Sequence, residues 1–217
     1  GLRHGLWDTE PGVRVRAIEA AAELGRTELL PNILEGRTDS DFPCSFTAAW
    51  ASARLGDRSS RTMGVLRDAA LSEMPFRLRA LSMAVRCLPI GPALDWFQDL
   101  AVSQPDLRLA AVAAGAIGDP SLADVLIAWM DVEALARVAG ESFYQITGAD
   151  LRRLDLDEDM PHRLRFAETL DEDSDLPYPS ARKVEGWWRA HRHLPRRPRS
   201  CSGRRAASRG SCPRRPA

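Results

Sequence analysis

The chain has 217 residues, of which 44% are hydrophobic and 28% are charged, and its formal net charge is zero. No apolar run approaches the ~20 residues that a helix needs to cross a bilayer. No basic start followed by an apolar core marks a secretory signal. These features argue against a membrane protein and predict a cytoplasmic location.

The zero net charge conceals a basic tail. Residues 196–217 contain eight Arg and no acidic residue, and they use only Arg, Pro, Ser, Cys, Gly and Ala. The first 195 residues carry 22 basic and 30 acidic side chains, a net charge of −8. An acidic body argues against non-specific nucleic-acid binding, which depends on the neutralisation of phosphates. The only segment suited to nucleic acid is therefore the tail.

Four apolar stretches with helical periodicity recur along the chain. Their last residues lie 31, 32 and 30 positions apart, and each has an Ala eight positions before its end. Positions −8, −5 and −1 share one helix face, where small residues let a neighbouring helix approach closely. The last residue is Gly in three copies, which suits a left-handed C-cap. The stretches are 13–25, 44–56, 76–88 and 107–118.

A short polar turn and a second apolar helix follow each of these stretches. Pro92 and Pro120 stand where first-turn prolines belong. Two helices in each repeat, with no strand pattern between them, predict an all-α fold: an α-solenoid of about four to five helical hairpins. An irregular helical bundle is the alternative, but the regular spacing weighs against it. The second helices are expected at 27–36, 60–71, 92–102 and 120–131.

The stretch GESFYQITGADL, residues 140–151, has residue types typical of an active-site loop. However, one step of 30 residues beyond Gly118 leads to Gly148, so the stretch takes the place of a fifth first helix. On this interpretation Gly148 is the C-cap, and Phe143 and Ile146 are core residues. Its other polar residues are expected at polar or edge positions: Ser142, Tyr144 and Thr147.

Residues 13–25, with the pattern V-R-x-x-A-x-x-A-x-x-x-L-G, resemble the short HEAT-like repeats first noted in phycobilisome lyases. The C-terminal half is similar to an uncharacterised family of bacterial HEAT-repeat proteins. Two motifs carry that similarity, AGESFYQITGADL (139–151) and LPYPSARKVEGWWRAHR (176–192). The resemblance covers residues 13–192 and implies a scaffold, and it brings no catalytic residue.

The chain is expected to have four parts. Residues 1–148 form the repeat array, which begins like the end of a preceding hairpin, so upstream repeats are expected to be missing. Residues 149–179 form a solvated acidic linker, and 180–194 form a cap helix in which Trp187 or Trp188 covers the last hairpin. Residues 195–217 are interpreted as a disordered tail produced by a frame shift in a GC-rich gene. The alternative is a basic arm that binds an anionic partner.

Signals for chemistry are weak. The segment DLDEDM (155–160) suggests a calcium loop, but it lacks the central Gly, and Phe166 stands where the bidentate Glu belongs. Cys44 and Cys87 lie in apolar helical contexts and are interpreted as packing residues. No His is followed by Glu, and no nucleophile elbow, phosphate loop or Rossmann glycine run is present. The sequence predicts no catalytic residue, cofactor or metal.

The preferred function is a non-catalytic scaffold that binds a protein on its concave face. Second helices usually line that face in HEAT-like arrays. The candidate protein-binding residues are therefore taken from them: Arg61, Arg67, Trp96, Asp99 and Trp129. The alternative is an enzyme or enzyme subunit on the same fold, either bilin lyase-type or a glycosylase-type protein that acts on nucleic acid. Titratable side chains converging in a groove would favour the enzyme.

Overall fold

The structure, a computed structural model, describes residues 1–102, 107–160 and 173–193. Within them the fold is all-helical, as predicted, and the one isolated antiparallel bridge joins Asp157 to Pro179. No helix in this part of the chain has the length and apolar character that a membrane span requires. Three short 3₁₀ helices occur at Thr27–Leu29, Gly36–Thr38 and Pro120–Leu122. The α-helices are α1 (Leu2–Gly5), α2 (Pro11–Glu23), α3 (Leu30–Glu35), α4 (Phe42–Arg54), α5 (Ser60–Ala70), α6 (Arg77–Cys87), α7 (Ile90–Val102), α8 (Leu107–Ile117), α9 (Ala123–Met130), α10 (Ala136–Thr147) and α11 (Ala181–His191).

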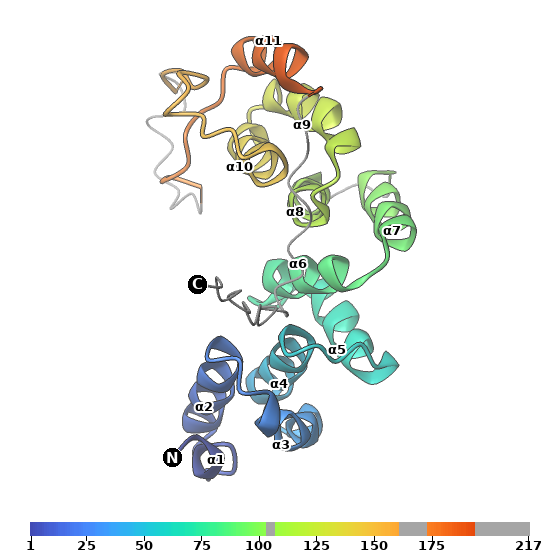
Figure 1. The fold of residues 1–217 in the computed structure, drawn as a ribbon, viewed down its shortest axis with the longest axis vertical. Coiled ribbons are helices and arrows are strands. Elements are labelled where there is room, and N and C mark those ends of the chain that lie inside the picture. Colours follow the sequence, from blue (N-terminus) through green and yellow to red (C-terminus); the bar gives the residue numbers. More distant parts are fainter. Residues whose placement is uncertain (103–106, 161–172, 194–217) are drawn as a thin grey trace, which may run out of the picture.

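The helices lie in two rows (Figure 1). One row contains the first helix of each hairpin, and its neighbours pack together: α2 with α4, α4 with α6, α6 with α8, and α8 with α10. The other row contains the second helices. Each of these packs against the first helix that follows it, as α3 does on α4, α5 on α6, α7 on α8 and α9 on α10.

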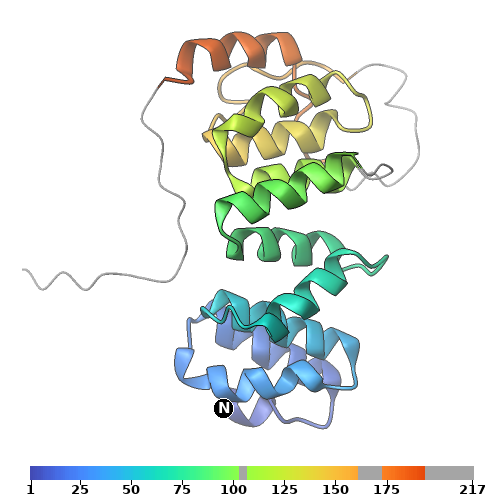
Figure 2. The ribbon, with the colours of Figure 1, turned by 90° about the vertical axis from the view of Figure 1, so that its right-hand side faces the viewer.

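The two rows bend, and the first helices form the inner side (Figures 1 and 2). Helices α5, α7 and α9 lie on the outer side, so the prediction that the second helices line the concave face is wrong for these three. The small residues of the first helices explain the direction of the bend. Ala48, Ala80 and Ala110 are fully buried between neighbouring helices, and a row that meets through alanines packs more closely than one that meets through larger side chains.

A close helix contact joins α8 to α10. A Cβ atom added at Gly115 would lie 2.9 Å from the Cα, Cβ and Oγ atoms of Ser142. The two backbones can approach this closely only because position 115 has no side chain. The same contact buries Ser142, which is 2% exposed, so its predicted edge position is wrong.

Helix ends repeat along the chain as predicted. The glycines at the ends of α2, α4, α8 and α10 all have left-handed backbone, with φ between 64° and 110°: Gly25, Gly56, Gly118 and Gly148. Leu88 takes the corresponding place after α6, and its extended backbone, with φ −80° and ψ 152°, ends that helix differently. Glycine tolerates positive φ without the steric cost that a Cβ atom imposes.

The stretch 140–151 is the end of a helix. It contains the C-terminal part of α10 and the Gly148 C-cap, whose amide donates to the carbonyl of Tyr144. Phe143 is fully buried and Ile146 packs against the same core, as predicted. Gly140 has a packing role, because a Cβ there would lie 3.0 Å from Leu151 Cδ1 and 3.3 Å from Pro179 Cγ.

Helix α11 closes the far end of the molecule (Figure 1). The buried Trp188 ring lies edge-on to Phe143, with a centroid distance of 5.9 Å, and its indole N–H donates to Asp124 of α9 at 2.9 Å. The ring of Trp187 also lies edge-on to Phe143, with a centroid distance of 6.1 Å. An aromatic cap on the last hairpin is what the Trp-Trp motif predicts.

The acidic linker is only partly as predicted. Asp173 is buried at 7% exposure, and Arg108 of α8 donates to it, with Nη2 2.8 Å from Oδ1. The amide of Ser180 donates to the carbonyl of Leu156, and that of Glu158 to Tyr178. These bonds hold the two described parts of the linker side by side, so these parts are packed against each other and are not a freely solvated linker. Residues 161–172 and 194–217, including Phe166 and the basic tail, lie outside the described residues.

Candidate protein-binding surface

The five candidate residues lie on three helices of the outer row. Arg61 and Arg67 are exposed on α5, and Asp99 is exposed on α7, one turn after the half-buried Trp96. The structure brings Arg67 and Trp96 together, with the guanidinium carbon 5.6 Å from the ring centroid. This distance lies within the range of cation–π attraction. The pair joins the exposed surfaces of α5 and α7.

Trp129 on α9 is half-buried and lies against Phe97 of α7, with a centroid distance of 6.0 Å and an interplanar angle of 42°. Both Trp96 and Trp129 also pack against the hydrophobic core. Part of each ring is therefore buried against the core, and only its exposed part is available to a partner. The three helices together carry a surface of arginine and tryptophan on the outer side of the bend.

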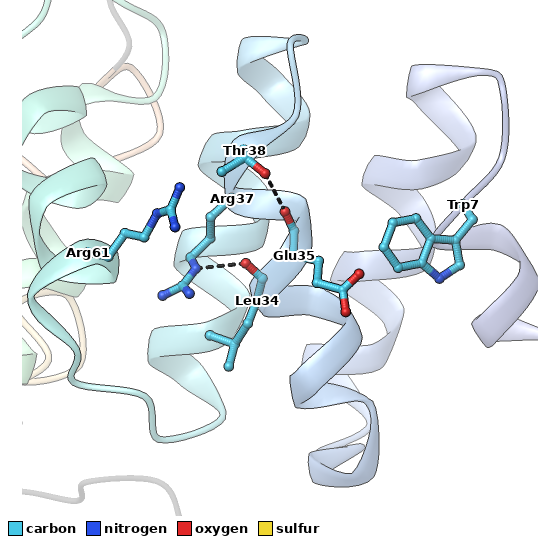
Figure 3. Close-up of a pocket in the computed structure, with 6 residues that line it drawn as sticks. All are labelled: Trp7, Leu34, Glu35, Arg37, Thr38 and Arg61. Atoms are coloured by element: carbon cyan, nitrogen blue, oxygen red, sulfur yellow. Dashed lines mark hydrogen bonds between the residues drawn. The ribbon is translucent and has the colours of Figure 1, made fainter.

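An open hollow of about 510 Å³ lies beside Arg61. Its wall is formed by residues from the α1–α2 turn, the α3 region and α5 (Figure 3). The lining residues are Trp7, Leu34, Glu35, Arg37, Thr38 and Arg61.

Arg37 is held in place at one side of this hollow. Its Nε donates to the carbonyl of Leu34 at 2.9 Å, and its Nη1 donates to Thr62 Oγ1 at 2.7 Å and Asp57 Oδ2 at 3.3 Å. Burial acts to raise the pKa of Asp57, but hydrogen bonds from Thr62 and Ser59 and the charge of Arg37 lower it below its ordinary value. Asp57 therefore stays ionised and balances the charge of Arg37.

Trp7 and Glu35 form the other side of the hollow (Figure 3). Trp7 is 54% exposed, although a tryptophan normally buries most of its surface. Thr38 donates to the carbonyl of Glu35 at 2.9 Å, which fixes the backbone there. Sequence interpretation missed Trp7 because residues 1–8 look like the end of a hairpin, and nothing local shows that α5 lies nearby.

A second arginine–tryptophan cluster on the first helices was also missed. The guanidinium of Arg79 on α6 lies 4.0 Å from the ring centroid of Trp50 on α4, and Arg54 lies 5.6 Å from it. Arg79 also pairs with Glu19 of α2 at 2.9 Å. An α6 side chain thus reaches α2 across α4, so the cluster clamps three helices of the inner row. No sequence motif links these residues, which come from three helices.

The 140–151 stretch borders a smaller hollow of about 230 Å³, which is lined partly by Glu141, Tyr144, Asp150 and Arg152. Three of these groups already have partners. Glu141 accepts from Gln145, Asp150 accepts from the amide of Arg153, and Arg152 donates to the carbonyl of Asp175. These bonds stabilise the helix end, which fits a repeat boundary.

Among the described residues, no group of three or more His, Cys, Asp or Glu side chains has the arrangement of a metal site. Cys44 is fully buried, and its thiol donates to the carbonyl of Pro11 at 3.4 Å. Burial, with hydrogen bonding to Asp41, raises the pKa of this thiol to about 11. Such a thiol is protonated and unreactive at neutral pH, as a packing role predicts.

Comparisons with protein-family models, with curated proteins and with solved structures found no match.

Proposed function

We propose that the chain is a non-catalytic scaffold of the HEAT-like type, an α-solenoid of four to five hairpins that binds a protein partner in the cytoplasm. Two observations support the repeat. The first helices pack in sequence order along one row. A left-handed glycine follows four of these five helices, and Leu88 follows the fifth. Stacked hairpins present long continuous surfaces, which repeat proteins use for binding.

The observation that supports the binding surface is the contact of the Arg67 guanidinium with the Trp96 ring. Arg61 is exposed on the same helix as Arg67. Arginine and tryptophan are the side chains most enriched at the centres of protein–protein interfaces. Here they come from α5 and α7, which are neighbours in the outer row (Figure 1), and the guanidinium carbon lies 5.6 Å from the centroid of the ring. A partner that covers this pair would bury a large aromatic surface without having to order it first.

The test is capture from an extract of the source organism with the full chain as bait, followed by reconstitution with the purified partner. Arg67→Glu reverses the charge beside Trp96 on an exposed position, and Arg182→Glu makes the same change on exposed α11. We expect one stoichiometric protein that the wild type and Arg182→Glu bind equally and that Arg67→Glu binds at least tenfold more weakly. A partner that binds all three chains equally would contradict the proposed surface, and the absence of any partner would contradict the scaffold.

A further inference from the structure

We propose that the hollow between the α1–α2 turn, the α3 region and α5 binds a peptide segment of the partner protein that carries both an acidic and a basic side chain. This inference rests on the proposed scaffold function and deepens it. The hollow has two ends of opposite character (Figure 3). Arg37 and Arg61 form the basic end, and Trp7 and Glu35 form the acidic and aromatic end.

The basic end suits a carboxylate. Arg37 is fixed by four hydrogen bonds to Leu34, Asp57, Ser59 and Thr62, and Asp57 balances its charge. Arg61 is exposed and has no charge partner among the described residues. An incoming Asp or Glu side chain would therefore meet one uncompensated guanidinium beside one that is already held in position. Arginine binds carboxylates through two parallel N–H donors, which favours this group over a neutral amide.

The opposite end suits a cation. The exposed indole of Trp7 attracts a guanidinium or ammonium group to its ring face, and the exposed carboxylate of Glu35 lies on the same side of the hollow. Together they offer both cation–π attraction and an ion pair to a Lys or Arg side chain. The apolar side chain of Leu34 lies on the wall between the two ends.

The size and openness of the hollow favour a segment of a larger partner. A volume of about 510 Å³ lies within the range of small-ligand sites, ~300–1,000 Å³. Such sites enclose most of their ligand, whereas this hollow is open to solvent. Side chains that project from a protein surface can fill it without being enclosed.

The experiment uses the purified full-length chain and an array of eight-residue peptides in an alanine background. One Asp and one Arg occupy every pair of positions in both orders, and matched peptides carry two Asp, two Arg or neither. We expect peptides with mixed charge, at one preferred spacing and order, to bind best. Arg61→Glu should weaken the best peptide at least tenfold, and Arg182→Glu should leave it unchanged.

The double variant Arg61→Glu/Glu35→Arg provides the sharpest test. It exchanges the charges of the two ends on exposed positions, so it should prefer the peptide in which Asp and Arg are exchanged. Equal binding of all peptide classes, or unchanged binding by Arg61→Glu, would overturn the inference. If the captured partner still depends on Arg67 in that event, the scaffold function stands and only the hollow is rejected. If no partner is captured either, both proposals fail.

Discussion

Neighbouring first helices are held together by different contacts at the two ends of their row. At the N-terminal end, Arg14 of α2 donates to Asp39 before α4 through two bonds of 2.8 and 2.9 Å, and its Nη1 donates to the carbonyls of Asp8 and Thr9. At the C-terminal end, α8 and α10 meet at Gly115 and Ser142, and Trp188 covers the adjacent core. An ion pair supplements the alanine packing of the first pair of helices, whereas close packing of two uncharged residues, Gly115 and Ser142, joins the second pair.

The difference follows from the size of the side chains available to each core. The core of α1 to α4 is small, and its buried residues are Ala, Leu and Ile. The core from α4 to α11 is larger and includes the aromatic rings of Phe46, Phe97, Phe143 and Trp188. A small core leaves the angle between helices weakly determined, so directional hydrogen bonds make a larger relative contribution there. Four predictions test this comparison.

Removing the aromatic cap should cause the largest loss. Trp188→Ala deletes a buried ring and its hydrogen bond to Asp124, and we expect the free energy of unfolding to fall by ~3–5 kcal/mol. Urea unfolding followed by circular dichroism measures it. Trp7→Ala is the matched control, because its ring is 54% exposed and its loss should change stability by less than ~0.5 kcal/mol. Equal effects of the two variants would show that the cap does not stabilise the C-terminal end.

Breaking the Arg14–Asp39 pair should show how much this ion pair contributes to the stability of the N-terminal end. Both side chains are about 15% exposed, and Asp39→Asn should cost ~1.5–3 kcal/mol, the range for hydrogen bonds to charged groups. Hydrogen bonds from Arg14 hold the pKa of Asp39 below its ordinary value. The stabilisation is therefore complete above the unfolded-state pKa, ~3.9, and is lost as the pH falls through the lower folded-state pKa.

Thermal unfolding between pH 7 and pH 2.5 measures this dependence. The wild type should lose stability on acidification, and Asp39→Asn should lose less, because its amide does not titrate. If both chains lost stability in parallel, Asp39 would not be a source of the acid sensitivity.

Widening the contact between α8 and α10 should weaken the C-terminal end by a smaller amount. Gly115→Ala places a methyl group 2.9 Å from backbone and side-chain atoms of Ser142, and this overpacking should cost ~1–3 kcal/mol. Gly64→Ala in α5 is the control, because a Cβ there meets nothing within 4 Å. That variant should gain up to ~1 kcal/mol from helix propensity. Opposite signs for the two variants in chemical unfolding would confirm that the contact, and not the loss of glycine, decides the outcome.

The smallest effect is expected at the helix end. Gly148→Ala puts a Cβ on a residue with φ 76°, where nothing lies within 4 Å of it. The cost should be only the left-handed backbone strain, ~1–2 kcal/mol. Gly148→Asn should recover part of it, because Asn tolerates this conformation better than Ala. An Ala variant as stable as the wild type would show that α10 can end without a left-handed residue.

Local features of the fold could be predicted from the sequence because they depend on nearby residues. A glycine that ends a run of helical periodicity has one conformational advantage, positive φ, and Gly25, Gly56, Gly118 and Gly148 all have it. The regular alanines likewise predicted which face of α4, α6 and α8 is buried. The aromatic motif at 187–188 predicted a cap because two adjacent tryptophans on a short helix cannot both face solvent without a large loss of burial.

Contacts between helices that are far apart in the sequence could not be predicted in this way. The arginines at 14, 79 and 108 look alike in sequence, yet they bind Asp39, Glu19 with Trp50, and Asp173 respectively. The choice of partner depends on how far one helix is rotated and shifted relative to the next. The same limit applies to Trp7 and Arg61, which share a hollow although 54 positions separate them.

The sequence by itself determined that the described chain is helical, approximately where the predicted helices lie, and which faces of the first helices are apolar, because periodicity and helix-end chemistry act within a few residues. Only the tertiary structure determined the direction in which the two rows of helices bend, which arginines pair with which acidic residues, and which tryptophans keep an exposed face. Those properties depend on the distance and angle between packed helices. The combined shape of many side chains from different helices sets this distance and angle.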